Sequence, residues 1–218
     1  MISADRARLR QGSYRLIGTG FDSPLKRGIE ETIQSVPVLV ELGLFDYSYA
    51  ISLIDYVEQL ATADLEDLAP AHRAMFGVGA GVASCPPTES AWLGDPHSGA
   101  TAVLLSELRQ AYLSYGIRPR HDSISPLDHA TVQFNVMATL CDMERERIVA
   151  GRSTERAVRH QADFLDHHLG IWVPQLSERM IGIDRHPTYN ALALAARALV
   201  VHDRELLGFQ AALPQASP

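Results

Sequence analysis

The adjacent residues Asp128 and His129 carry two side chains that could carry out acid–base chemistry. A carboxylate and an imidazole can act as a general acid and a general base. Because adjacent positions on a helix point in different directions, the two cannot form a simple proton relay with each other. The stretch that begins at Ser125-Pro126 also carries a helix start signal, with serine at the cap, proline at the first helical position and Asp128 three residues after the cap. Asp128 therefore has two interpretations, a functional acid or a capping residue.

Metal binding has weak support in the sequence. His160, His167 and His168 are close in sequence, but no HExxH motif and no cysteine or carboxylate set at ligand spacing accompanies them. The two cysteines, Cys85 and Cys141, lack CxxC spacing, which argues against a structural zinc site and against a disulfide scaffold. We predict no metal.

A metal-dependent helical hydrolase that uses Asp128, His129 and the His167/His168 pair is the alternative from the enzyme class. A generic helical scaffold without a peptide groove is a third interpretation. In that case, replacing Asp128 and His129 with alanine would leave every interaction unchanged.

The main irregular stretch of the chain begins at Gly77. Its glycines at positions 77, 79 and 81 resemble a phosphate-binding loop only superficially, because no GK[ST] follows and no strand precedes them. Pro86-Pro87 would stiffen a surface loop here, beside Glu89 and Trp92. Binding residues favour loops that a rigid scaffold positions. The chain also has no GxSxG elbow, so the sequence offers little support for catalysis.

Apolar residues recur at helical spacing along the whole chain, and nothing before residue 77 alternates convincingly with the period of a strand. Helices are expected over residues 4–20, from 23 to 37, within 38–60, over 64–76, around 104–116, from 125 to about 151, from 153 to 174 and over 189–209. Pro70 either splits its helix or marks the first turn. We predict an all-α, single-domain helical bundle over residues 1–213 and a disordered tail over 214–218. Two lobes, before about 77 and after about 100, are the alternative.

The composition is that of an ordinary globular protein, with 218 residues, 46% hydrophobic and 21% charged. Its formal net charge of -7 makes a nucleic-acid partner unfavourable, since phosphate binding needs a basic face. An acidic protein can instead attract an arginine-containing peptide. The N-terminus is polar and no apolar run approaches the length of a membrane span, so we expect a cytoplasmic protein that does not insert into a membrane.

Four blocks in one order resemble the TorD/DmsD/NarJ family of molybdoenzyme-maturation chaperones over about residues 8–210. The blocks are Met75-Phe76-Gly77, the Cys-Pro-Pro-Thr-Glu-Ser-Ala-Trp run over 85–92, Asp128-His129, and the FLxxHLxxWxP run over 164–174. The loop and the last run are the most specific. The form of the loop is similar to that of chaperones for dimethylsulfide, ethylbenzene, chlorate or selenate-type enzymes.

The resemblance implies a binding protein without turnover, so we predict that the chain is not an enzyme and needs no cofactor. Such proteins bind the N-terminal signal segment of an apo molybdopterin oxidoreductase catalytic subunit and hold it in the cytoplasm for cofactor insertion, before assembly or twin-arginine export. For this chain, both a monomer and a dimer stay open. Six residues are the implied peptide-binding candidates: Phe76, Pro86, Glu89, Trp92, Asp128 and His129. Four others fall in the packing half of the signature: Phe164, His168, Leu169 and Trp172.

The chain departs from the family pattern near the Asp-His pair. Leu127 stands where the family reads proline, and Gln133 and Asn135 stand where acidic residues are common. These changes remove negative charge that could meet the arginines of a signal segment. We expect a groove of apolar side chains with acidic residues at its rim. Reversible binding corresponds to about -8 to -12 kcal/mol, or micromolar to nanomolar affinity.

Overall fold

The computed structural model describes residues 3–77, 83–93, 99–118, 125–183 and 185–212. The helices in chain order are α1 (Ala4–Gly20), α2 (Lys26–Glu41), the 3₁₀ turn η1 (Leu44–Asp46), α3 (Ala50–Thr62), α4 (Leu65–Phe76), α5 (Ser90–Leu93), α6 (Ala100–Ser114), α7 (Ala130–Val149), α8 (Glu155–Phe164), the π-helical segment η2 (Leu165–Leu169), α9 (Gly170–Ile183) and α10 (Pro187–Ala212). Within these residues no strand forms, and extended pairing is limited to one isolated bridge, Thr88–His129. The predicted all-α fold is confirmed.

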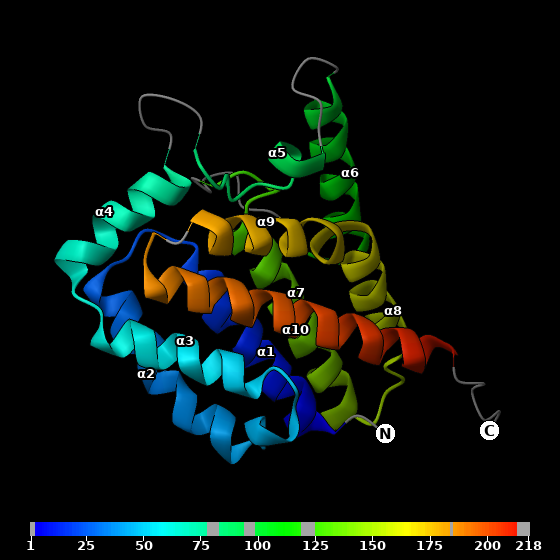
Figure 1. Cartoon of the computed structure of the whole chain (residues 1–218). Coiled ribbons are helices and arrows are strands. Elements are labelled where there is room, and N and C mark those ends of the chain that lie inside the picture. The colour runs from blue at the N-terminus through cyan, green and yellow to red at the C-terminus, as the bar shows by residue number, and fades with distance from the viewer. Residues whose placement is uncertain (1–2, 78–82, 94–98, 119–124, 184, 213–218) are drawn as a thin grey trace.

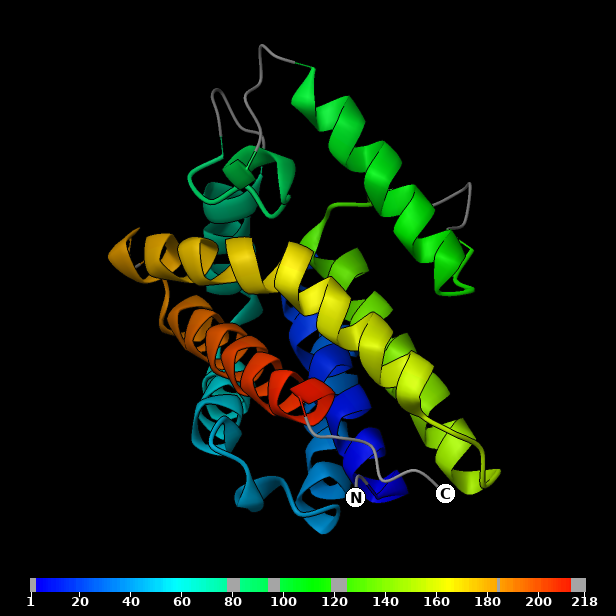
Figure 2. The same ribbon diagram turned by 90° about the vertical axis from the view of Figure 1, so that its right-hand side faces the viewer.

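Helices α1 and α7 pack along each other at the centre of the bundle (Figure 1). Helix α10 packs on α9 and α3, and α2 lies beside α1 and α3 on the lower side of the view. Figure 2 shows that α8, η2 and α9 form one long helical run, while α6 stands at the periphery. The bundle therefore leaves one end, near α5 and the start of α7, to irregular segments.

One continuous hydrophobic core joins both halves of the chain. Leu9 and Tyr56 belong to the same buried cluster as Phe134, Trp172 and Leu199. Residues before 77 and after 100 thus share this core. The domain limits 1–213 stay a prediction, and the tail over 214–218 lies outside the described residues.

A buried ionic centre crosses this core. The guanidinium of Arg10 is fully buried and donates to Asp203 (2.8 Å), Glu144 (3.1 Å) and the side-chain oxygen of Gln161 (2.6 Å). A buried charge is costly unless it is paired and hydrogen-bonded. The contacts join α1 to α7, α8 and α10, so they fix the relative positions of four helices.

Two prolines that were expected to end helices lie inside them. Pro37 lies within α2, which continues to Glu41, and Pro174 lies within α9. A proline lacks one backbone N–H, and water can hydrate the unpaired carbonyl where the helix surface is exposed, as at Pro37. Pro70 also lies inside an unbroken helix, α4. The endings predicted at Gly116 and near Gly151 are confirmed, and both glycines have positive φ.

In the described part of the chain, no helix combines the length and the apolar character needed to span a membrane.

Candidate functional site

The loop over residues 85–93 lies against the chain that leads into α7, and backbone hydrogen bonds hold the two together. The amide of Glu89 donates to the carbonyl of Asp128 (2.9 Å), and the amide of Ala130 donates to the carbonyl of Pro87 (2.8 Å). The Thr88–His129 bridge lies between them. At its other end, the loop is tied to α4 by the amide of Cys85, which donates to the carbonyl of Met75 (2.8 Å). We call residues 85–93 and 126–130 the platform.

Helix α7 begins at Ala130, so the prediction that it starts at Ser125-Pro126 is wrong. Its N-cap is His129, whose Nδ1 accepts a hydrogen bond from the amide of Thr131 (3.2 Å). The amide of His129 donates to the carbonyl of Pro126 (3.1 Å), which makes a turn, and the chain then runs extended to pair with the loop. The tertiary pairing therefore overrides the local start signal.

Asp128 is a capping residue, but the helix that it caps is α5. Its Oδ2 accepts from the amide of Ser90 (3.1 Å), the first residue of α5, and the side chain is almost fully buried. The local spacing therefore predicted correctly that Asp128 is a capping residue, but it assigned the cap to the wrong helix.

Glu89 forms the centre of a buried polar clamp. Its carboxylate accepts from Nδ1 of His168 (2.9 Å and 3.2 Å to its two oxygens) and from the side-chain amide of Gln133. The oxygen of Gln133 accepts in turn from the indole N–H of Trp172 (2.9 Å). The clamp joins the loop to α7, η2 and α9. The packing role expected for His168 and Trp172 is confirmed, as it is for the buried Phe164 and Leu169.

The π-helical segment η2 carries the histidine of this clamp. Five residues, Leu165–Leu169, interrupt the α-helical run, and such π-bulges occur frequently at functional sites. The next residue is Gly170, where a Cβ atom would collide with the carbonyl oxygen of Leu165. Glycine is therefore required where α-helical geometry resumes.

Pro86 and Trp92 lie on the platform, whereas Phe76 lies in a neighbouring aromatic cluster. The indole N–H of Trp92 donates to the carbonyl of Pro86 (2.8 Å), and both residues are half-buried on the platform. Phe76 is buried in an aromatic cluster, with ring centroids 5.7 Å from Phe21 and 5.5 Å from Tyr189. The cluster joins the end of α4 to the ends of α1 and α10.

Asp22 links the platform to a pocket, and the sequence analysis missed it. The hydroxyl of Thr131 donates to its carboxylate (2.9 Å), and Asp22 lies close enough to His129 to favour the protonated imidazole. Burial lowers the pKa of His129 by more than Asp22 and Asp128 raise it, so the pKa lies below its ordinary value. The only sequence signal for Asp22 was an acidic residue at the helix break before Ser23-Pro24.

The pocket beside Asp22 has a volume of about 270 Å³. Its walls come from the end of α1, the first half of α2, and parts of α3, α4 and α10. Its lining combines apolar and aromatic groups, among them Leu25, Tyr56, Leu60, Leu68 and Tyr189. Glu31 also lines it and is paired with Arg27 (2.7 Å). Asp22 is exposed and bonded to a neutral hydroxyl, so its charge remains available to a cation.

Of the six peptide-binding candidates, the structure brings five together on the platform, and Phe76 lies in the adjoining aromatic cluster. Glu89, Asp128 and Phe76 are buried. Pro86, Trp92 and His129 are partly exposed. The buried members shape the site, and the others lie where a bound molecule can reach them.

The histidines and carboxylates named for a hydrolase do not form a metal-ligand group. His168 bonds to Glu89, and His167 is exposed, with its Nδ1 2.8 Å from the carbonyl oxygen of Asp163. Across the described ranges, no three His, Cys, Asp or Glu side chains come together in a way that could hold a metal ion. Most of the glycine stretch considered for nucleotide binding, residues 78–82, lies outside the described residues.

Comparison with known proteins defines the class of this molecule first by its fold. The chain superimposes on the crystal structure of a redox enzyme maturation protein from Archaeoglobus fulgidus with a TM-score of 0.55. The superposition covers 86% of this chain and 91% of the other, at 17% sequence identity. At this identity the likeness shows a shared fold.

Sequence comparison then gives the family. The family model described as nitrate reductase delta subunit matches residues 46–178, more than half of the 218-residue chain, so the chain belongs to this family. The resemblance to the TorD/DmsD/NarJ family is confirmed.

Three relatives show how far the similarity extends. The selenate reductase assembly chaperone protein of Thauera selenatis is 31% identical over 148 residues, which is 67% of this chain and 73% of that protein. The chlorate reductase assembly chaperone protein of Ideonella dechloratans is 28% identical over 66% of this chain and 72% of that protein. The chaperone protein TorD of Vibrio cholerae is 27% identical over 101 residues, 46% of either chain. The match thus spans about half the length of these TorD relatives.

Proposed function

We propose that this protein is a system-specific chaperone in the assembly of a molybdopterin oxidoreductase. It binds the N-terminal signal segment of the apo catalytic subunit and holds that subunit in the cytoplasm until its cofactor is inserted. The names of the selenate and chlorate reductase assembly chaperones support the role. The protein supplies a binding surface and catalyses no reaction in this role.

The observation that carries the proposal is the apolar pocket with Asp22 at its edge, next to the platform. A signal segment combines apolar residues with arginines, so it needs an apolar cavity and a carboxylate. The pocket provides Tyr56, Leu60, Leu68 and Tyr189 for the apolar part. Asp22 provides the charge, and a bidentate arginine–carboxylate contact is directional as well as charged.

The platform residues have different roles in this proposal. Glu89 and Asp128 are positioning residues, because their carboxylates hold the loop against α7 and are buried. Pro86, Trp92 and His129 contact the segment from the exposed side. Phe76 supports the pocket wall through its contact with Tyr189. The negative charge missing at Gln133 and Asn135 is replaced, in this arrangement, by Asp22 on α1–α2.

A peptide titration tests the proposal. A labelled peptide with the N-terminal sequence of the catalytic subunit of a molybdopterin oxidoreductase from the same host is titrated with the purified chain, and fluorescence anisotropy gives the affinity. We expect micromolar to nanomolar binding. Asp22→Asn should weaken it by up to about fivefold, since exposed ion pairs contribute about 0.2–1 kcal/mol. The asparagine can still accept the Thr131 hydrogen bond, so the fold is retained.

Glu146→Gln is the matched control for this titration. It removes the same charge from an exposed position on α7. The proposal is wrong if the segment does not bind, and the assignment of Asp22 is wrong if both variants bind equally well. Replacing the arginines of the peptide with glutamine should remove the difference between wild type and Asp22→Asn.

A further inference from the structure

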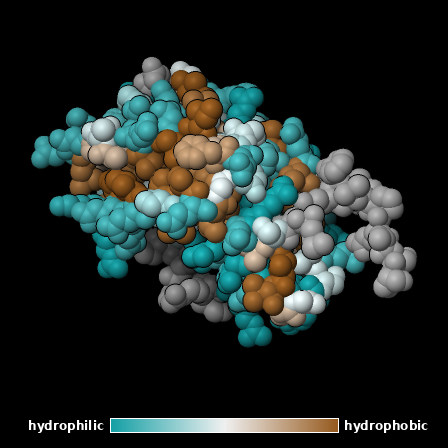
Figure 3. Space-filling model, turned by 90° about the horizontal axis from the view of Figure 1, so that it is seen from below, coloured by the Kyte–Doolittle hydropathy of each residue, from teal (hydrophilic) through white to brown (hydrophobic). Residues whose placement is uncertain are grey.

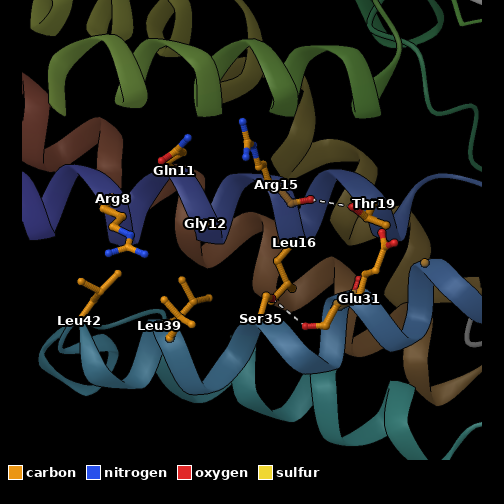
Figure 4. Close-up of a pocket in the computed structure, with 13 residues that line it drawn as sticks. Arg8, Gln11, Gly12, Arg15, Leu16, Thr19, Glu31, Ser35, Leu39 and Leu42 are labelled. Carbon is orange, nitrogen blue, oxygen red and sulfur yellow. Dashed lines mark hydrogen bonds between the residues drawn. The ribbon is translucent and has the colours of Figure 1, made fainter. Parts of the chain in front are cut away.

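A second groove lies between α1 and α2 (Figure 4). It adjoins the pocket assigned to the client segment, and the two share Thr19, Gly28, Glu31 and Thr32 in their walls. Its volume is about 380 Å³, within the range of ligand sites in proteins. Leu16 and Leu39 form a buried floor, and Leu42 and the partly exposed Val38 extend it toward the end of α2. The floor of the groove is thus apolar.

Gly12 gives this groove its shape. A Cβ atom at Gly12 would overlap the Cδ2 atom of Leu39, so the absence of a side chain lets α2 approach α1 closely at this point. In Figure 4, Leu39 and Leu42 point from α2 toward the turn of α1 that carries Arg8 and Gly12. The floor of the groove is therefore fixed by packing between the two helices.

The charge of the groove is positive in an otherwise acidic protein. Arg8 and Arg15 line it from α1 and are exposed. They are seven residues apart, which is about two turns or 10.5 Å along the helix. The lining carboxylate, Glu31, is already bonded to Arg27 (2.7 Å). The arginines therefore favour a negatively charged partner, whereas the net charge of the chain is -7.

The backbone of the groove walls favours a helical partner. Both walls are α-helices, whose backbone groups are bonded internally, so they offer no edge to which an extended peptide could add as a strand. Ser35, which lines the α2 wall, donates its hydroxyl to the carbonyl of Thr32 in its own helix (2.7 Å). The walls therefore offer a peptide no backbone partners, and a helix, which bonds its own backbone internally, suits the groove.

Exposed apolar side chains also occur near the end of α2 and just after it. Val40 is 39% exposed and Phe45, on η1 directly after α2, is 66% exposed. Figure 3 shows apolar surface gathered on the face to which α2 belongs, with hydrophilic atoms around it. Contiguous apolar patches with polar rims mark interaction sites.

We propose that the groove between α1 and α2 is a docking site for an acidic amphipathic helix of a partner protein. The apolar face of that helix lies on Leu16, Leu39 and Leu42, and its carboxylates bind Arg8 and Arg15. This inference does not rest on the proposed function, because the client segment carries arginines, which the two arginines of the groove would repel.

The test uses a synthetic amphipathic helical peptide with leucines on one face and glutamates along its edge. Binding is followed by NMR of the methyl groups of Leu16, Leu39 and Leu42 in the full chain, and by anisotropy of the labelled peptide. We expect saturable shifts of these methyl signals and an affinity that falls with salt. The peptide with glutamine in place of glutamate should bind about tenfold more weakly or not at all.

Two variants and one control make the result specific. Arg8→Glu with Arg15→Glu should weaken binding about tenfold or more. Ser35→Phe should weaken it by filling the groove without a change of charge. Arg152→Glu with Arg185→Glu changes the net charge equally at exposed positions outside the groove, and should leave the affinity within about twofold once salt screens long-range effects. Circular dichroism checks that each variant is folded.

Four results would overturn the proposal. The methyl signals of the groove do not shift, or the glutamine peptide binds as tightly as the glutamate peptide. Alternatively, the control pair weakens binding as much as Arg8→Glu with Arg15→Glu, or Ser35→Phe binds the acidic peptide with wild-type affinity. Concentration-dependent self-association that Arg8→Glu with Arg15→Glu abolishes would assign the groove to a second copy of this chain instead. The client-peptide titration with the same variants should stay at or above wild-type affinity, so failure here is distinguishable from failure of the proposed function.

Discussion

Two buried carboxylate networks hold this molecule together, and they connect different kinds of structure. The Arg10 centre places one guanidinium between two carboxylates and joins four long helices inside the core. The Glu89 clamp places one carboxylate between an imidazole and an amide, and joins an irregular loop to the helices. The first network fixes the bundle. The second fixes the surface that the bundle presents, so damage to the two should appear in different measurements.

The largest effect is expected from breaking the Arg10 centre. Arg10→Met keeps much of the apolar volume but leaves Asp203 and Glu144 buried without their cation. Removing one partner of a buried ion pair costs about 3–5 kcal/mol. Urea unfolding followed by circular dichroism should show a loss of this size in the free energy of unfolding.

Arg8→Met is the control, because it makes the same substitution two residues away on the exposed side of α1. Its effect should lie within about 0.5 kcal/mol of wild type. Adding Glu144→Gln and Asp203→Asn to Arg10→Met should recover part of the loss, since it removes the uncompensated charges. Equal stability of Arg10→Met and Arg8→Met would contradict the importance of the centre.

A smaller effect on stability, but a larger one on binding, is expected from Glu89→Gln. The glutamine amide turns one acceptor into a donor that faces the donors of Gln133 and His168. An unsatisfied buried polar group costs about 1–3 kcal/mol. Because the variant makes the loop less ordered, its affinity for the client peptide should fall. Arg10→Met, in contrast, should change this affinity little at temperatures where the variant remains folded.

Tryptophan fluorescence is the direct measurement for this variant. The chain has two tryptophans, and both are bonded within the site: Trp172 to Gln133, and Trp92 to Pro86. Glu89→Gln should shift their emission while the protein is still folded, and the exposed control Glu146→Gln should not. If both the emission spectrum and the peptide affinity are unchanged, the clamp does not hold the loop in place for peptide binding.

The comparison of the two networks also shows what the sequence could reveal. Helices were predictable because apolar spacing is a local property, as along Val132, Val136 and Leu140 in α7. Neither network was predictable from spacing, since Arg10 and Asp203 are 193 residues apart and Glu89 and His168 are 79 apart. The resemblance named Glu89 and His168 separately, and only the structure joins them.

The errors have the same cause. Ser125-Pro126 is a good helix start by local rules, yet α7 begins four residues later because residues 128–130 pair with the loop. Asp22 was passed over because an acidic residue at a helix break is common in sequences. Its importance comes from Thr131, from His129 and from the pocket, all of which the fold brings to it.

The smallest effect concerns a single cap at the edge of the platform and depends on pH. The pKa of His129 is lowered from its ordinary value by burial, against Asp22 and Asp128, which raise it; His72 lowers it further. His129 thus binds a proton less readily in the folded protein than in the unfolded chain, where a histidine titrates near pH 6.5. The stability that neutral His129 contributes is retained above this pH and is lost as the pH falls through it. Protonated Nδ1 can no longer accept from the amide of Thr131, which removes the cap of α7.

His129→Asn isolates this contribution, because asparagine is a good N-cap and does not titrate. The free energies of unfolding of wild type and variant, measured from about pH 7.5 to pH 5, should diverge below about pH 6.5, with the wild type losing up to about 2 kcal/mol more, the range of cap substitutions. His160 and His202 also have pKa values that burial lowers, but they are present in both proteins and cancel in the difference. The pKa of His72 is lowered by burial as well, and because His72 is coupled to His129, a His72→Gln background removes its contribution from both proteins. Parallel pH profiles would show that the cap does not depend on the charge of His129. A divergence would show that the platform, unlike the Arg10 centre with its permanently charged guanidinium, weakens near neutral pH.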